Sequence, residues 1–123
     1  MATSLVLAND QAAIDGIRAA GAEQLIIAPG NGYTGGHAWL DSSQGDDPSS
    51  DYLYKLVDPL NNTALDIHEY LDVDFSGGHS VCNQSGPTNL AGLTGWLEEY
   101  GLKVCLFKQE EWNLLTLVRG YGY

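Results

Sequence analysis

Short apolar runs alternate with helix-like segments along this chain of 123 residues, and this alternation constrains the fold more than any other feature. The runs "QLIIAP" (24–29), "TALDIHEYL" (63–71) and "LKVCLF" (102–107) have the length and composition of strands in a largely buried sheet. Strands that alternate with helices form a parallel sheet, because each helical crossover returns the chain to the end of the sheet at which the preceding strand began. The sequence therefore predicts an α/β fold with about four to five strands and three helices.

The expected helices lie before and between these runs. Residues 9–21 carry polar capping residues, apolar side chains at helical spacing and Gly21 as a stop. Residues 3–8 fit either a short strand or the lead into this helix. We expect a short capped helix over residues 49–59 and an amphipathic helix over residues 88–101.

The charge of the chain excludes some classes of partner. Sixteen acidic residues against five basic ones give a net charge of −11. Such a field repels nucleic acid and anionic lipid, and it suits neutral or cationic partners. No apolar run approaches the length of a membrane span, and "MATSLVLAND" lacks the features of a signal peptide. We expect no nucleic-acid binding and no membrane insertion, and the localisation stays unknown on these grounds.

Two motifs imitate ligand-binding loops but are incomplete. "GNGYTGG" (30–36) has the glycine spacing of a dinucleotide fingerprint, but no helix is expected after its third glycine. We interpret it as a glycine-rich substrate loop. "DVDFSG" (72–77) resembles the front of a calcium loop, but Asn83 stands where a bidentate Glu should close the cage, which favours an Asx-rich turn. The three histidines have no metal-ligand spacing, so we expect neither a metal nor a cofactor.

His68 and Tyr70 are the pair of residues that best indicates a functional site. They lie two residues apart on one expected strand, so they point to the same face. At the C-terminal end of a parallel strand, that face opens on the crevice where such folds bind ligands. A histidine that is buried and hydrogen-bonded within the core is the alternative for His68. The sequence alone leaves both interpretations open.

Three stretches, taken in order, resemble fungal endoglucanases of glycoside hydrolase family 5. They are "AAIDGIRAAGAEQLIIAPGNGYTGGHAWLDSS", "DPLNNTALDIHEYLDVDFSG" and "LTGWLEEYGLKVCLF", and together they cover about residues 10–106. The family enzymes are secreted (β/α)8 barrels that cleave β-1,4-glucans with retention. The resemblance implies that this chain is an incomplete barrel segment, around the fifth, sixth and seventh strands.

The same resemblance implies that both catalytic carboxylates of the family are missing from this chain. The family's acid/base Glu lies in an Asn-Glu-Pro motif that is absent here, and Lys108 stands at the position of the nucleophile Glu. A retaining mechanism needs two carboxyl groups about 5–5.5 Å apart. We therefore expect a small non-catalytic protein that acts through its surface. The alternative is a residual glycosidase rebuilt from other acidic residues, namely Asp66, Glu69, Glu110 or Glu111.

The resemblance also implies a remnant of the family's substrate site. His68 and Tyr70 match a His and a Tyr on the sixth strand, Trp39 matches a loop tryptophan, and Tyr33 and His37 stand where the family often has Trp. Sugars stack on aromatic faces, so Tyr33, Trp39 and Tyr70 would form a weak platform. A weak β-glucan or oligosaccharide-binding module is thus an alternative function. A fungal taste-active protein that acts on a protein receptor is another.

The tail from residue 107 to residue 123 has no resemblance to the family and is expected to add a strand within "WNLLTLVRGYGY". We nevertheless expect one domain over residues 1–123. Four or five strands cannot close an eight-stranded barrel, so the inner face and the edges of the sheet need a cover. We expect a homo-oligomer, most simply a dimer that completes a barrel-like core. A monomeric open sheet with helices on both faces is the alternative.

Two kinds of covalent modification stay open from the sequence. Cys82 and Cys105 either pair as one disulfide or remain free thiols, since two cysteines do not specify a compartment. The resemblance matches Cys82 to a family cysteine whose partner lies further along the chain. Asn61 and Asn83 fit the N-glycosylation pattern, which applies only in a secreted protein.

Overall fold

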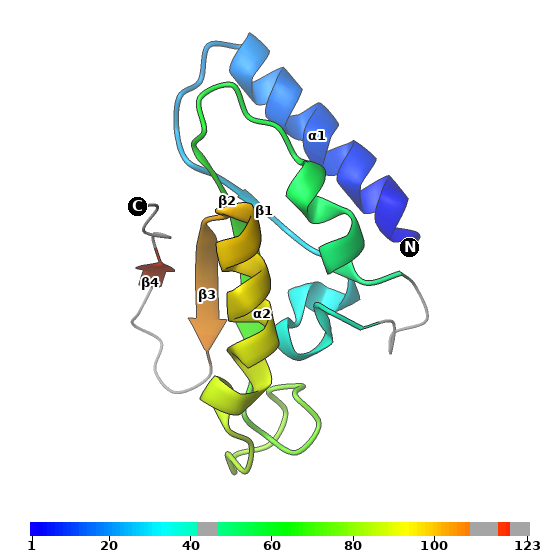
Figure 1. The fold of residues 1–123 in the computed structure, drawn as a ribbon, viewed down its shortest axis with the longest axis vertical. Coiled ribbons are helices and arrows are strands. Elements are labelled where there is room, and N and C mark those ends of the chain that lie inside the picture. The colour runs from blue at the N-terminus through cyan, green and yellow to red at the C-terminus, as the bar shows by residue number, and fades with distance from the viewer. Residues whose placement is uncertain (42–46, 109–115, 119–123) are drawn as a thin grey trace.

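The computed structural model describes residues 1–41, 47–108 and 116–118 (Figure 1). These residues form a four-stranded sheet in the order β1-β2-β3-β4, in which β1, β2 and β3 run parallel and β4 pairs antiparallel with β3. The elements are α1 (Thr3–Ala19), β1 (Ile26–Ala28), β2 (Thr63–Glu69), α2 (Gly86–Tyr100), β3 (Val104–Lys108) and β4 (Thr116–Val118). The chain between β1 and β2 adds four 3-10 turns: η1 (Gly32–Thr34), η2 (Gly36–Ala38), η3 (Ser49–Asp51) and η4 (Leu53–Lys55). The predicted α/β class with an incomplete parallel sheet is confirmed.

The helices differ from the sequence prediction in two places. Helix α1 begins at Thr3 rather than at residue 9, so residues 3–8 are its first turns; Val6 and Leu7 pack against the core there. The expected helix over residues 49–59 is instead the pair of turns η3 and η4. Tyr52 separates these turns with backbone angles of φ −126° and ψ −46°, which interrupt the helical path. Of the three helices expected, two are therefore α-helices in the part of the chain that the structure describes.

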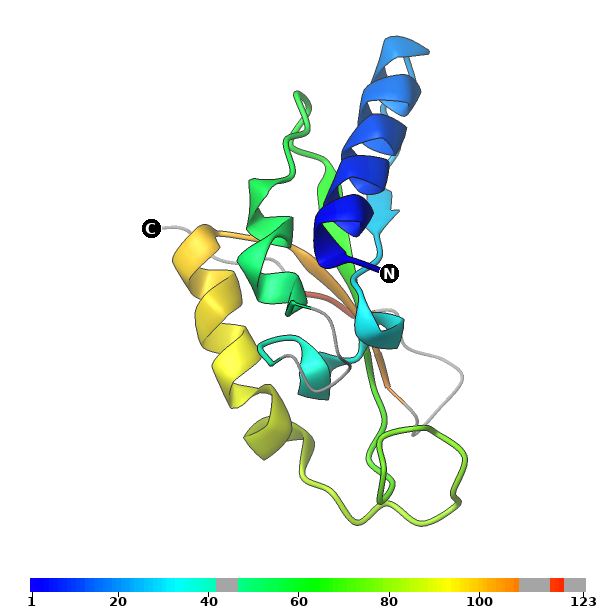
Figure 2. The same cartoon turned by 90° about the vertical axis from the view of Figure 1, so that its right-hand side faces the viewer.

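Helix α2 has clear start and stop signals. Its first turn contains Pro87, whose missing N–H would have no intrahelical partner there, and Gly101 ends it in the left-handed region at φ 62°. Leu93 and Trp96 are the buried residues of its inner face. Figures 1 and 2 show α2 lying along one face of the sheet. Among the described residues, no helix combines the length and the apolar character that a membrane crossing requires.

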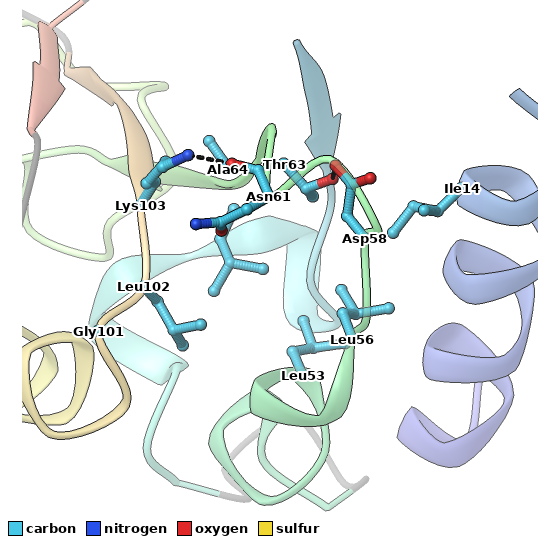
Figure 3. Close-up of a pocket in the computed structure, with 11 residues that line it drawn as sticks. Ile14, Leu53, Leu56, Asp58, Asn61, Thr63, Ala64, Gly101, Leu102 and Lys103 are labelled. Carbon is cyan, nitrogen blue, oxygen red and sulfur yellow. Dashed lines mark hydrogen bonds between the residues drawn. The ribbon is translucent and has the colours of Figure 1, made fainter. Parts of the chain in front are cut away.

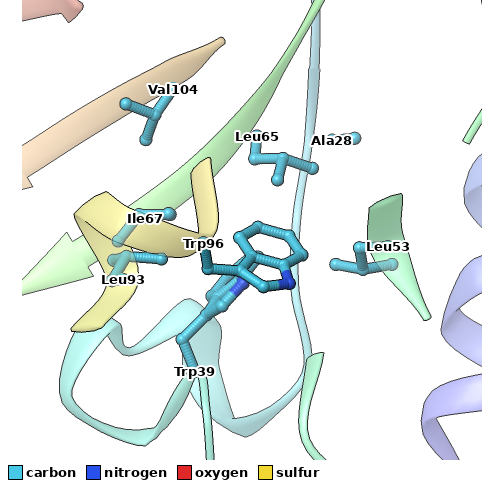
Figure 4. Close-up of a cluster of buried hydrophobic side chains, with 8 residues drawn as sticks. All are labelled: Ala28, Trp39, Leu53, Leu65, Ile67, Leu93, Trp96 and Val104. Carbon is cyan, nitrogen blue, oxygen red and sulfur yellow. The ribbon is translucent and has the colours of Figure 1, made fainter. Parts of the chain in front are cut away.

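The core lies between α2 and the sheet (Figure 4). Alternate residues of β2, among them Leu65 and Ile67, point to this side and are almost fully buried. Trp39, in the loop after β1, packs edge to face against Trp96 of α2, with ring centroids 6.1 Å apart. The cluster of buried apolar residues comprises Ala28, Trp39, Leu53, Leu65, Ile67, Leu93, Trp96 and Val104.

The opposite face of the sheet carries the other alternate residues. Asp66 and His68 of β2 lie on this face, and the strand register places Ile27 of β1 and Phe107 of β3 there as well. Ile27 is 39% exposed and Phe107 is 40% exposed, whereas Cys105 of β3, which pairs with Asp66, is buried. This face, defined by Ile27, Asp66, His68 and Phe107, is called the inner face below.

A buried ion pair fixes α1 to the chain before β2. The guanidinium of Arg18 donates two hydrogen bonds of 2.8 Å to Asp58, and the Asp58 carboxylate also accepts the Thr63 hydroxyl. These donors, Arg18 first, hold the pKa of Asp58 far below its usual range. A cavity of about 80 Å³ lies beside this carboxylate, where Lys103 donates to the Asn61 carbonyl (Figure 3). It lies at the N-terminal end of β2, away from His68.

Both cysteines are free thiols in this structure. Cys105 is buried in β3, and Cys82 is exposed in the segment between β2 and α2. The disulfide alternative is therefore not formed between them. Asn61 and Asn83, which carry the glycosylation pattern, are both exposed.

Candidate functional site

A cavity of about 470 Å³ opens at the C-terminal end of β2 and is the candidate site. Four of the five residues predicted as a substrate-binding remnant line it together: Tyr33, His37, His68 and Tyr70. They come from the segment after β1 and from the end of β2, and the single crossover between these parallel strands brings them to the same end of the sheet. This aromatic cavity is lined by Gly32, Tyr33, Gly35, His37, His68, Tyr70, Asp74, Phe75 and Ser76.

His68 and Tyr70 share one wall of the aromatic cavity, as their spacing predicted. Their rings meet edge to face with centroids 6.4 Å apart, and His68 also packs edge-on against Phe107 of β3 at 5.3 Å. The His68 Nε2 atom lies 3.2 Å from Asp66 Oδ1, and the His68 side chain is 33% exposed. A half-exposed imidazole beside a carboxylate is not the buried core histidine that the sequence left as an alternative.

The glycine-rich segment after β1 brings Tyr33 and His37 over the end of β2. Gly35 forms a parallel bridge with His68, which anchors the segment to the strand. Tyr33 and Thr34 both adopt left-handed backbone angles, at φ 56° and φ 57°. Such angles cost non-glycine residues energy and concentrate at functional sites. Because Tyr33 is also 93% exposed, its ring is available to a ligand.

The turn over residues 72–79 completes the aromatic cavity, and Asp72 organises it. The buried Asp72 carboxylate accepts hydrogen bonds from the Gly77 and His79 amides and from the Ser76 hydroxyl, and His79 Nδ1 lies 3.1 Å from it. Burial opposes the charge of Asp72, but these donors outweigh burial and lower its pKa to about 2. The Asx-rich turn predicted from "DVDFSG" is therefore present.

Three potential metal ligands gather in this turn. One atom each of Asp72, Asp74 and His79 lies within 4.8 Å of the other two. The Asp72 oxygens already accept the hydrogen bonds that hold the turn together, so the cluster has a structural explanation without an ion. Its charge acts on His79, whose pKa is raised by the hydrogen bond to Asp72 and by the charge of Asp74.

Phe75 is a cavity residue that the sequence reasoning missed. Its ring stacks on the His37 imidazole with centroids 4.4 Å apart and an interplanar angle of 11°. The only signal in the sequence was an aromatic side chain in the middle of a polar turn, at a place where loops seldom need one. The long-range contact with His37 is a tertiary feature, since 38 positions separate the two residues.

Trp39 does not join the aromatic cavity. It is 1% exposed and packs in the core against Trp96, on the α2 side of the sheet. Gly30 makes this possible, because a Cβ at that position would lie 2.4 Å from the Trp39 ring. The expected platform of Tyr33, Trp39 and Tyr70 thus loses its tryptophan to the core.

The acidic residues considered for a rebuilt glycosidase are dispersed. Glu69 is 2% exposed and points toward α2, where it accepts a hydrogen bond of 3.2 Å from Asn89; burial raises its pKa. Asp66 lies on the inner face beside His68. The backbone of Lys108, the residue predicted at the nucleophile position, pairs with Glu69 at the end of β3. Glu110 and Glu111 lie outside the described residues.

Comparison with known proteins explains this arrangement. The cellulase (glycosyl hydrolase family 5) family model matches residues 3–113. Endoglucanase 1 of Robillarda sp. (strain Y-20) is 66% identical over 103 residues, which cover 84% of this chain and 26% of that protein. Endo-beta-1,4-glucanase B of Emericella nidulans is 41% identical over 104 residues, which cover 82% of this chain and 30% of that protein.

Solved structures agree with the sequence relatives. The endo-beta-1,4-glucanase Xac0030 from Xanthomonas axonopodis pv. citri superposes with a TM-score of 0.81 at 37% identity, over 86% of this chain and 34% of that one. XacCel5A in complex with cellopentaose gives 0.80 at 38% identity, again over 86% of this chain and 34% of that one. The chain thus spans about a quarter to a third of the length of these relatives.

These relatives contradict the expectation that the chain is not an enzyme. The relatives from Robillarda and Emericella are both named as endoglucanases, and they are 66% and 41% identical to this chain. The expectation depended on the inference that the family's two catalytic carboxylates are missing from this stretch. A stretch that covers 26% of a relative is no evidence that those carboxylates are lost. By the family match over residues 3–113, the chain belongs to the cellulases of glycosyl hydrolase family 5.

Proposed function

We propose that this chain forms part of the glucan-binding surface of an endo-β-1,4-glucanase, and that the aromatic cavity holds sugar residues of a β-1,4-glucan. The observation that carries the proposal is the convergence of Tyr33, His37, His68 and Tyr70 on one cavity. They come from segments that lie more than thirty residues apart in the sequence. Relatives named as endoglucanases, and a neighbour in complex with cellopentaose, support the same ligand class.

The chemistry of the aromatic cavity suits a neutral sugar. The C–H faces of a β-linked glucose ring stack on aromatic rings, and Tyr33 presents an exposed ring for this contact. The imidazoles of His37 and His68 and the Tyr70 hydroxyl offer hydrogen-bonding groups to sugar hydroxyls. A net charge of −11 would disfavour an anionic ligand but does not oppose an uncharged one.

In this proposal the residues of the aromatic cavity bind and orient the glucan and do not cleave it. Hydrolysis with retention needs two carboxyl groups about 5–5.5 Å apart, on either side of the glycosidic bond. Such a pair acts only on a sugar that is held in register, because orientation supplies a large share of the rate. His68 lies in β2 and Tyr70 directly follows the end of this strand, so the sheet gives their rings a rigid support.

A calorimetric titration of the 123-residue chain with cellopentaose tests the proposal. We expect saturable binding in the millimolar range or tighter, weakened by His68→Ala and by Tyr33→Ala. The matched control is Val57→Ala, because Val57 is 66% exposed and lies before β2, at the end of the strand away from the cavity. An α-1,4-linked oligosaccharide of equal length is the ligand control. The proposal fails if cellopentaose gives no binding signal at millimolar concentration.

We also propose that two copies of this chain associate along the β1 edge of the sheet. β1 is an edge strand of the described sheet, and Ile27, which pairs with Ala64 four residues before His68, leaves apolar surface exposed there. Light scattering is expected to give twice the mass of the 13.2 kDa chain, and Ile27→Asp is expected to return it to the monomer. A monomer mass for the wild type would refute the dimer. A taste-active role at a protein receptor stays a prediction, for which a receptor-cell assay is the test.

A further inference from the structure

Phe75 is an aromatic residue in an unfavourable backbone conformation, at the wall of the aromatic cavity. Its φ is 59°, in the left-handed region where a bulky residue is an outlier. Hydrogen bonds from Ser76, Gly77 and His79, which follow Phe75, to the Asp72 carboxylate before it close the turn and hold the backbone in this conformation. A strained conformation that the surroundings maintain calls for a reason, and functional sites are where such strain concentrates.

The contacts of Phe75 indicate that its strained backbone serves to orient the His37 ring. The Nδ1 atom of His37 is buried and has no hydrogen-bond partner among the described residues. No polar contact at that atom therefore fixes the imidazole plane. The parallel stack with Phe75, at 4.4 Å and 11°, is the contact that sets it. A Cβ on Gly35 would lie 2.8 Å from His37 Cε1 and 3.1 Å from His37 Nδ1, so the Gly35 backbone lies close to this edge of the ring.

The same turn also supports a second wall of the aromatic cavity. A Cβ on Gly77 would lie 2.8 Å from Tyr70 Cδ1, so the backbone of the turn packs directly on the Tyr70 ring. The positions of both rings thus depend on one turn. Its Phe75 ring stacks on His37, and its backbone at Gly77 packs on the Tyr70 ring. We propose that Phe75 is a positioning residue of the sugar site, which holds the His37 imidazole in the plane that a β-linked glucan ring contacts. This inference rests on the proposed function for the identity of the ligand.

Substitution of Phe75 by Gly separates a positioning role from a structural one. Glycine adopts φ 59° without strain, so Phe75→Gly removes the ring while it relaxes the backbone. Phe75→Ala removes the ring and keeps the strain. We expect both variants to bind cellopentaose about two- to tenfold more weakly, the range for loss of one aromatic contact. We expect Phe75→Gly to melt at a higher temperature than Phe75→Ala.

The His37 ring protons give a readout that does not depend on sugar. In the wild type the Phe75 ring current shifts their NMR resonances upfield, and we expect them to move downfield in Phe75→Gly. Asn61→Gly is the matched control, because Asn61 also has a left-handed φ, of 47°, and does not line the aromatic cavity. We expect it to leave both the His37 resonances and the affinity unchanged.

The outcomes distinguish this inference from the proposed function. If the wild type does not bind cellopentaose, the proposed function fails, while the His37 resonances still report on the stack. If Phe75→Gly folds and retains wild-type affinity, the positioning role is refuted. Phe75→Leu keeps apolar volume in the turn and removes the aromatic ring. Unchanged affinity in that variant would likewise overturn the inference, even if the glycine variant fails to fold.

Discussion

Gly36 lies at the contact between the glycine-rich segment, β2 and α2, and its replacement by Ala tests how tightly the aromatic cavity is fixed to the core. A Cβ at this position would lie 2.7 Å from Leu90 Cδ2, 2.9 Å from Glu69 Oε2 and 3.2 Å from Ile67 Cγ2. Ordinary contacts of this kind are 3.5–4.0 Å. The Leu90 methyl can rotate away, but Glu69 and Ile67 are 2% and 0% exposed and have no free space to move into.

The expected effect of Gly36→Ala follows from two opposing contributions. Overpacking of a core costs about 1–3 kcal/mol, and the reduced freedom of the unfolded chain returns about 0.4–1 kcal/mol. The net loss in the free energy of unfolding is about 0.5–2 kcal/mol. For a domain of this size, that corresponds to a melting temperature lowered by about 2–8 °C. Because Gly36 begins the turn η2 that carries His37, we also expect weaker binding of cellopentaose.

Gly95→Ala is the matched control for this substitution. Gly95 is an exposed residue inside α2, and a Cβ there would meet nothing within 4 Å. Alanine is favoured over glycine in a helix interior by about 0.5–1 kcal/mol, so we expect the melting temperature to rise by about 2–4 °C. Thermal unfolding followed by circular dichroism measures both variants. If Gly36→Ala is as stable as Gly95→Ala, the packing of η2 on β2 is not as tight as the contacts require.

Three further predictions concern the core, the turn and the thiols. Trp39→Phe is expected to lower the free energy of unfolding by about 1–3 kcal/mol without a change in sugar affinity; chemical denaturation and calorimetry would contradict this if affinity fell instead. Asp72 has a pKa lowered to about 2 from an ordinary 3.8, so its stabilisation of the turn is present above pH 3.8 and is lost as the pH falls toward 2. His79 has a raised pKa, so its stabilisation of the turn is present below pH 6.5 and is lost as the pH rises through the pKa of the folded state. The protection factors of the turn amides, which correct for the intrinsic pH dependence of exchange, should therefore be highest between about pH 4 and 6.5, and protection factors that do not change with pH would refute this. Cys82 should react with a thiol reagent at once and Cys105 only on unfolding, since Cys105 is buried and burial raises its pKa; two fast thiols would contradict the structure.

The sheet was the most predictable part of this molecule. Strands β1, β2 and β3 are short apolar runs that follow turns or helices in the sequence, and such runs have few alternatives in a compact domain. The pair His68 and Tyr70 was predictable for the same reason, because strand periodicity alone places them on one face. The approximate bounds of α2 followed from its apolar spacing and from Gly101.

The contacts between distant segments were not predictable from local pattern. Trp39 looks like a sugar-binding aromatic in the sequence, but its place is decided by the room that Gly30 leaves and by Trp96 of α2. Phe75 looks like a surface residue of a polar turn, yet it stacks on His37. The segment over residues 49–59 has helical composition, but the break at Tyr52 limits it to single turns. In each case tertiary packing decides between conformations that local propensity leaves nearly equal.

Strand β2 links the core and the aromatic cavity through the alternation of its side chains. His68 faces the aromatic cavity, whereas its neighbour Glu69 faces α2 and contacts the position of Gly36. Gly36 in turn begins the turn that carries His37, so the buried and the exposed sides of one strand hold two walls of the same cavity. A change on the buried side of β2 therefore reaches the cavity through the η2 turn and not through His68. Substitutions at Glu69 should accordingly disturb His37 more than His68, which the NMR resonances of the two imidazoles would distinguish.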